Sequence, residues 1–287
     1  MYIKRKTKCR SNIGPLKNEA KETVADDQGM AELLNKFFGS VFTREDITII
    51  PSADEIETDI MQEVEVTEKV VKNKIRNLKT ASAAGPDGIG PRLLQELENE
   101  LAPALTLIFR RSIEYGEIPE DWKTANVTPI YKKGAKADPG NYRPVSLTSV
   151  SCKILESIVK DTMMDHLLRK NLLSPSQHGF VPGRSCCTNL LEFLEKTTEV
   201  IDAGKPFDVV FLDFAKAFDK VPRERLLEKL RAHKIRGRTL NWIRNCMAHW
   251  EETACGTQRE VFYVGRSPVW SPTGQCFGPN LIPDFHQ

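Results

Sequence analysis

The sequence predicts a mixed α+β protein, because helical and strand-like apolar patterns both occur along its 287 residues. Apolar side chains recur at helical spacing over residues 30–42 and form one continuous stripe. Residues 125–131 and 207–213 are instead short, nearly continuous apolar runs of the kind found in strands. We therefore expect helices packed on a small antiparallel sheet.

The N-terminal part of the chain reads as an appendage to a more compact body. Residues 1–27 are polar and lack an apolar period, which predicts a loose basic arm. The stripe that follows predicts an ordered helix that buries Phe37 and Phe38. The stretch 45–68 carries nine acidic side chains and no basic one. Because like charges repel, we expect its part up to residue 66 to be a mobile linker.

Capping residues and apolar spacing predict the helices further along the chain. Thr67 is a typical N-cap, and Pro91 and Pro222 suit the first turn of a helix. Apolar positions with helical spacing mark four more helical faces: Leu101, Leu105, Ile108 and Phe109; Ile154, Leu155, Ile158 and Val159; Leu190, Leu191, Leu194, Thr197 and Ile201; and Leu226, Leu227 and Leu230.

The compact part begins near residue 79, with a run of small residues that ends in Gly-Pro-Asp-Gly at 85–88. This tetrapeptide requires a turn, because glycine and proline supply the backbone angles that turns need. We interpret Asp87 as a residue that forms the turn rather than as a catalytic one.

Composition excludes several classes of protein. Hydrophobic residues make up 40% and charged residues 28%, which excludes collagen-like and wholly disordered chains. No apolar run reaches the roughly 18 residues of a membrane span, and no apolar segment follows the basic N-terminus as in a secretion signal. The seven cysteines are scattered without a C-x-x-C pair, so neither a disulfide framework nor a zinc ribbon fits. We expect an intracellular protein, in the nucleus or the cytoplasm.

Charge is segregated along the chain although the formal net charge is only +2. Residues 211–250 carry ten basic and four acidic side chains. Such a stretch can bind phosphate groups, and a solvated helical surface would show the same pattern.

Asp213 ends the second strand-like run, where a carboxylate is costly unless it is solvated, paired or bound to a cation. Four motifs precede it: Ala-Gly-Pro-Asp-Gly-Ile at 84–89, Thr-Pro-Ile-Tyr-Lys-Lys at 128–133, Asn-Tyr-Arg-Pro-Val-Ser-Leu at 141–147 and Gln-His-Gly-Phe-Val-Pro-Gly-Arg-Ser at 177–185. In this order and spacing, the series resembles the reverse transcriptases of LINE-type, non-LTR retrotransposons, and most of all their jockey-like vertebrate branch. The resemblance covers about residues 12–282.

The resemblance implies a partial right-hand polymerase within residues 67–287. The fingers would span about 79–205 and the first half of the palm about 206–287, with residues 1–66 as a helical appendage. The implied reaction is RNA-templated addition of deoxynucleotides to a primer 3′-hydroxyl with Mg²⁺. Its implied partners are an RNA template, a DNA primer and a dNTP, with no membrane.

The resemblance also assigns roles to individual residues. Asp213 would be the catalytic, metal-binding aspartate of the palm. Lys132, Lys133 and Arg143 would hold the triphosphate, and Phe218 would block a ribose 2′-hydroxyl. The residues that would contact template or primer are Gln177, Gly179, Gly183, Arg184 and Gly274. Each also has a plain structural reading: a solvated turn for the lysines, a core position for Phe218 and a loop between helices for residues 177–184.

The sequence departs from the family where the second metal ion needs its ligands. The family supplies further carboxylates on an aromatic-Ala-Asp-Asp turn, and none follows Asp213. Ala-Asp-Asp occurs only at 25–27, in the polar arm, where we attribute it to chance. Thr273 replaces a glutamine that positions template and nucleotide in the family. With its last residue at Gln287, the sequence reads as a truncated copy, and we expect it to be inactive alone. The alternatives are a non-catalytic nucleic-acid-binding remnant and a decayed reading frame without function.

Overall fold

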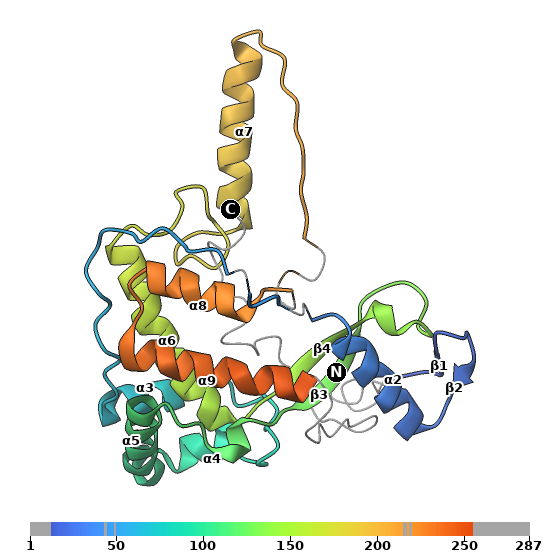
Figure 1. Ribbon diagram of the computed structural model, residues 1–287, viewed down its shortest axis with the longest axis vertical. Coiled ribbons are helices and arrows are strands. Elements are labelled where there is room, and N and C mark those ends of the chain that lie inside the picture. The colour runs from blue at the N-terminus through green and yellow to red at the C-terminus, as the bar shows by residue number, and fades with distance from the viewer. Residues whose placement is uncertain (1–12, 43–44, 49, 215–216, 218–219, 255–287) are drawn as a thin grey trace, which may run out of the picture. The chain divides into compact units, whose positions relative to one another are not determined.

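A computed structural model describes residues 13–42, 45–48, 50–214, 217 and 220–254 (Figure 1). Helices predominate, and two small antiparallel sheets pair β1 with β2 and β3 with β4, which confirms the mixed class. The elements are β1 (Leu16–Lys17), β2 (Thr23–Val24), α2 (Asp27–Gly39), α3 (Glu68–Arg76), α4 (Pro91–Glu96), α5 (Glu98–Tyr115), β3 (Asn126–Tyr131), β4 (Tyr142–Leu147), α6 (Val150–Arg169), α7 (Cys186–Asp202), α8 (Arg223–Ala232) and α9 (Gly237–Ala254), with short 3-10 turns at Glu120–Trp122 and Pro139–Asn141.

The described residues form two compact units, which we treat separately. The first contains the described residues of 13–42, 65–155 and 241–254, and the second those of 45–64 and 156–240. The expected domain boundary after residue 66 and the division into fingers and palm stay predictions. Among the described helices, none combines the length and apolar character that a membrane span needs.

In the first unit, α2 packs against the β3–β4 hairpin (Figure 1). The predicted helix over 29–42 is thereby confirmed, with Phe38 only 8% exposed and Phe37 packed partly buried beside it. The core between α2 and the hairpin consists of Leu16, Met30, Leu34, Phe38, Val127 and Tyr142. A two-stranded hairpin is marginally stable alone, so this core holds β3 and β4 in place.

The expectation of a loose arm is wrong for residues 13–27. They form the short β1–β2 hairpin, in which Leu16 is fully buried and the Lys17 N–H donates to the Ala137 carbonyl at 2.7 Å. A strand of two residues is too short for its alternation to stand out in the sequence. Residues 1–12 lie outside the described residues.

The structure gives Asp26, in the Ala-Asp-Asp at 25–27, a structural role. Its carboxylate accepts a hydrogen bond from the Gly29 N–H at 2.7 Å and caps the start of α2. This placement agrees with the view that the tripeptide is not the catalytic turn of a palm.

The expected helix starts and turn are confirmed elsewhere in the first unit. Thr67 caps α3 by accepting from the Val70 N–H at 3.3 Å, and Pro91 is the first residue of α4. The Asp87 carboxylate accepts from the Ile89 N–H at 3.1 Å, as a turn former does. A Cβ on Gly85 would lie 2.6 Å from backbone atoms of residues 148 and 149, so only glycine fits there.

In the second unit, α8 buries the predicted leucines, and Pro222 immediately precedes this helix. Helix α7 also forms over the predicted residues, but its apolar face is not buried. The exposed fractions of Leu190, Leu191 and Leu194 lie between 55% and 62%. The helical spacing therefore predicted the helix correctly, but its apolar face is exposed rather than buried.

The strand expected over 207–213 is not formed. Phe211 and Leu212 are 83% and 86% exposed, and no strand is assigned to these residues. An interior strand requires hydrogen-bonded neighbours, and the four described strands pair only with each other. The local apolar run therefore did not suffice to predict a strand.

The acidic linker is also more ordered than expected. In the described residues of 45–64, the Ile56 and Met61 N–H groups donate to the carbonyls of Ala232 and Lys234, and Val64 is buried. The prediction considered only repulsion within the segment. The structure brings basic side chains from distant parts of the chain against it, and these neutralise its charge.

Candidate nucleic-acid interface

The β3–β4 hairpin carries two of the predicted phosphate-binding residues on one face. Ile130 pairs with Arg143 in the antiparallel register, and the Lys132 N–H donates to the Asn141 carbonyl at 2.8 Å. Because side chains alternate between faces, Lys132 and Arg143 are diagonal neighbours, roughly 7–8 Å apart in such a pair. Both are exposed, and the opposite face buries Val127 and Tyr142.

Hydrogen bonds fix the loop that closes this hairpin. The Tyr142 hydroxyl donates to the Lys136 carbonyl at 2.7 Å, and the Asn141 side-chain amide donates to the Ala135 carbonyl at 2.9 Å. Burial raises the pKa of the Tyr142 hydroxyl, so it stays protonated and able to donate at neutral pH. The Lys136 ammonium lies 5.7 Å from the centre of the Tyr131 ring. The resulting basic tip consists of Lys132, Lys133, Lys136 and Arg143.

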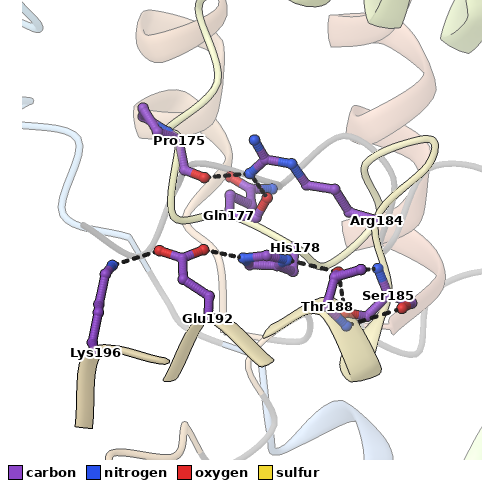
Figure 2. A network of polar contacts seen from close by, with 8 residues as sticks. All are labelled: Pro175, Gln177, His178, Arg184, Ser185, Thr188, Glu192 and Lys196. Carbon is purple, nitrogen blue, oxygen red and sulfur yellow. Dashed lines mark hydrogen bonds and ion pairs between the residues drawn. The ribbon is translucent and has the colours of Figure 1, made fainter. Parts of the chain in front are cut away.

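In the second unit, the loop before α7 contains four predicted contact residues, Gln177, Gly179, Gly183 and Arg184. Figure 2 shows the side chains of Gln177 and Arg184 in this loop. The Arg184 guanidinium donates to the carbonyls of Pro175 and Gln177. The Gln177 side-chain amide donates to the Gly179 carbonyl at 3.2 Å. Some of the N–H donors of the exposed Arg184 are therefore used in hydrogen bonds that hold the loop in shape.

The two glycines of this loop differ in what their own backbone requires. Gly183 has φ +78°, a left-handed conformation that favours glycine. Gly179 has no such angle, and no atom lies within 4 Å of the position a Cβ would take. Neither backbone strain nor a close neighbour in the structure explains the glycine at 179.

The sequence did not predict the hydrogen bonds that connect this loop to α7. His178 is within 2.8 Å of the Thr188 hydroxyl and 2.7 Å of the Glu192 carboxylate (Figure 2). Hydrogen bonds from Lys196 and His178 lower the pKa of Glu192. Thr188 and Ser185 also form a capping box. The spacing of Ser185 and Thr188 could have indicated the cap, whereas no local pattern linked His178 to α7.

The structure does not assemble a metal centre at Asp213. This carboxylate is exposed in a segment without a strand. Within the described part of the chain, no group of three or more His, Cys, Asp or Glu side chains could hold a metal ion. The described residues therefore do not fit the Mg²⁺ site that the family implies, and we derive no step through it. Phe218, Thr273 and Gly274 lie outside the described residues.

Comparison with known proteins gives a consistent assignment. A family model described as reverse transcriptase (RNA-dependent DNA polymerase) matches residues 130–269. The chain is 29% identical over 165 residues to the RNA-directed DNA polymerase from mobile element jockey of Drosophila melanogaster, covering 57% of this chain and 18% of that protein. It is 26% identical over 183 residues to the probable RNA-directed DNA polymerase from transposon BS of the same species, covering 62% and 20%.

A third relative matches more of the chain. The Pol polyprotein from type-1 retrotransposable element R1 of Bradysia coprophila is 24% identical over 258 residues, covering 87% of this chain and 24% of that protein. The chain thus spans about a fifth of the length of the relatives it matches. The family match over residues 130–269 and these relatives support the identification of the chain as part of a reverse transcriptase of the LINE-type, non-LTR retrotransposon class.

Proposed function

We propose that this chain binds the triphosphate and nucleic-acid ligands of a non-LTR reverse transcriptase and does not synthesise DNA by itself. The parent reaction is RNA-templated addition of dNTPs to a primer 3′-hydroxyl. The observation that carries the binding proposal is the pair of exposed cations, Lys132 and Arg143, on one face of a hairpin with a buried core beneath it.

Phosphate chemistry explains why these residue types suit the site. Arginine offers a planar fork of donors for two phosphate oxygens, and lysine adds a compact positive charge. The hydrogen bonds in the hairpin loop fix the backbone that carries these cations before a ligand arrives, which lowers the ordering cost of binding. We assign Lys132, Lys133 and Arg143 to the triphosphate and the loop over 177–184 to template or primer backbone.

The carboxylates available in the sequence support the second part of the proposal. Phosphoryl transfer of this kind uses two divalent ions, which clamp the attacking and leaving oxygens. Asp213 can contribute one carboxylate, but no aromatic-Ala-Asp-Asp turn follows it within these residues, and Thr273 replaces the template-positioning glutamine. Every 1.36 kcal/mol of lost transition-state stabilisation lowers the rate about tenfold. Without the two metal ions, the loss of stabilisation amounts to several times this energy.

The hairpin proposal is tested by removing two charges from one face. Lys132→Gln with Arg143→Gln should weaken dNTP binding about tenfold or more, because each charge-assisted hydrogen bond contributes roughly 1.5–3 kcal/mol. Isothermal titration calorimetry measures the change. The matched control is Lys69→Gln with Arg111→Gln, which removes the same charge at exposed helical positions of the same unit. Equal losses in the two variants would reject the hairpin as the triphosphate site.

The open space at Gly179 gives a second prediction. Gly179→Ala should leave the urea unfolding midpoint unchanged or slightly higher, since alanine there meets no atom and reduces the freedom of the unfolded chain. Its affinity for single-stranded RNA should fall severalfold, because the methyl group would occupy the space of an approaching backbone. Gly14→Ala, which likewise meets no atom, is the control. Unchanged RNA affinity would leave Gly179 without a role in binding.

Primer extension tests the lack of catalysis. With RNA template, DNA primer, dNTPs and Mg²⁺, the chain should give no extension, and Asp213→Ala should change nothing. The polymerase from a full-length jockey-type element serves as the positive control. Extension by the purified chain that Asp213→Ala abolishes would show that the inactivity proposal is wrong.

A further inference from the structure

The acidic segment, defined as the described residues of 45–64, lies against a basic surface of the second unit. It carries seven acidic side chains and no basic one. The basic surface consists of Lys170, Arg225, Lys234, Arg236 and Arg238, from the end of α6, from α8, from the α8–α9 connection and from the start of α9. Each of these five cations makes an ion pair with the acidic segment.

One end of the segment is fixed at the N-terminus of α8. The Glu45 carboxylate accepts hydrogen bonds from the N–H groups of Glu224 at 2.8 Å and Arg225 at 3.2 Å. It also lies 3.6 Å from the Arg225 guanidinium, and its side chain is only 9% exposed. A carboxylate at this position satisfies unpaired N–H groups and interacts favourably with the helix dipole. Glu45 is therefore an anchor.

The middle of the segment is held by three exposed carboxylates that pair with the basic surface. Glu55 pairs with Lys234 at 2.7 Å and with Arg236, Asp59 pairs with Lys170, and Glu63 lies 3.7 Å from Arg238. Hydrogen bonds from Lys234 and Arg236 lower the pKa of Glu55. A hydrogen bond from Lys170 similarly lowers the pKa of Asp59. The segment thus presents ionised carboxylates to the cations at neutral pH.

Backbone contacts determine which part of the segment can detach. The Ile56 N–H donates to the Ala232 carbonyl at 3.3 Å, and the Met61 N–H donates to the Lys234 carbonyl at 3.0 Å. Met61 and Val64 are buried, whereas Glu55 and Asp59 are 59% and 83% exposed. The stretch between the Glu45 anchor and Met61 is therefore held mostly by pairs whose carboxylates are exposed to solvent, while the Lys234 and Arg236 side chains that they contact are 15% and 35% exposed.

We propose that the acidic segment is an intramolecular competitor of nucleic acid for this basic surface. The proposal rests on the proposed function, that the chain binds nucleic acid. Ion pairs whose carboxylate is exposed to solvent are weak and screened by salt, so a polyanion can replace that carboxylate. A nucleic-acid backbone offers the same cations a row of negative charges and releases counterions when it binds. RNA binding at the surface then requires the stretch between Glu45 and Met61 to move away.

Two charge-matched variants separate competition from a general charge effect. Glu55→Gln with Asp59→Asn removes carboxylates that pair with the surface, and Asp54→Asn with Glu57→Gln removes the same charge from neighbours for which the described residues show no ion pair. All four are exposed, so the variants should fold. Affinity for a uridine homopolymer RNA should rise about threefold or more in the first variant relative to the second.

Hydrogen exchange reports the displacement directly. When the RNA binds the unmodified chain, the Ile56 amide should exchange faster, because its bond to Ala232 is broken. The Val71 amide, which donates to the Thr67 carbonyl at the start of α3, serves as the reference.

Three results would each overturn the proposed competition: equal affinities in the two variants, no RNA binding by either variant, or an Ile56 amide that stays protected in the complex. RNA binding that is weakened by Gly179→Ala but does not depend on Glu55 and Asp59 would overturn this inference and leave the proposed function standing.

Discussion

Burial of the apolar stripe of α2 against β3 and β4 is the interaction on which the candidate interface depends. Leu34 and Leu16 are fully buried in this core, and Val127 and Tyr142 contribute the inner face of the hairpin. Each fully buried side chain of this size contributes roughly 1.5–3 kcal/mol, whereas a two-stranded hairpin in water is marginal. The core fixes the inner face, and strand alternation then places Lys132 and Arg143 on the outer face.

Local rules predicted the elements whose causes are local. Thr67 and Pro91 mark helix starts by capping and ring geometry, and both act as expected. The turn at Asp87 follows from the chemistry of Gly-Pro-Asp-Gly, although the close packing of Gly85 on residues 148 and 149 could not be read from the sequence. The strand over residues 125–131 was predicted by its apolar run, but its pairing with residues 142–147 and the register that places Lys132 and Arg143 on one face required the structure.

Long-range contacts account for what the sequence did not predict. Leu16 belongs to the core because α2 covers it, and a single leucine in a polar stretch gives no periodic signal. The acidic segment was expected to be mobile because its charges repel, but its partners lie more than a hundred residues further along the chain. The apolar side chains of α7 and of residues 207–213 were expected to be buried and are exposed instead. An apolar pattern in the sequence does not show whether another element packs against it.

Lysine footprinting tests most directly whether the hairpin is the ligand interface. The chain is acetylated with and without a dNTP, and each lysine is quantified by mass spectrometry. We expect the dNTP to protect Lys132 and Lys133, while Lys69 and Lys79, exposed elsewhere in the same unit, react equally in both samples. Protection at Lys69 or Lys79 with none at Lys132 and Lys133 would show that the dNTP binds elsewhere than at the hairpin.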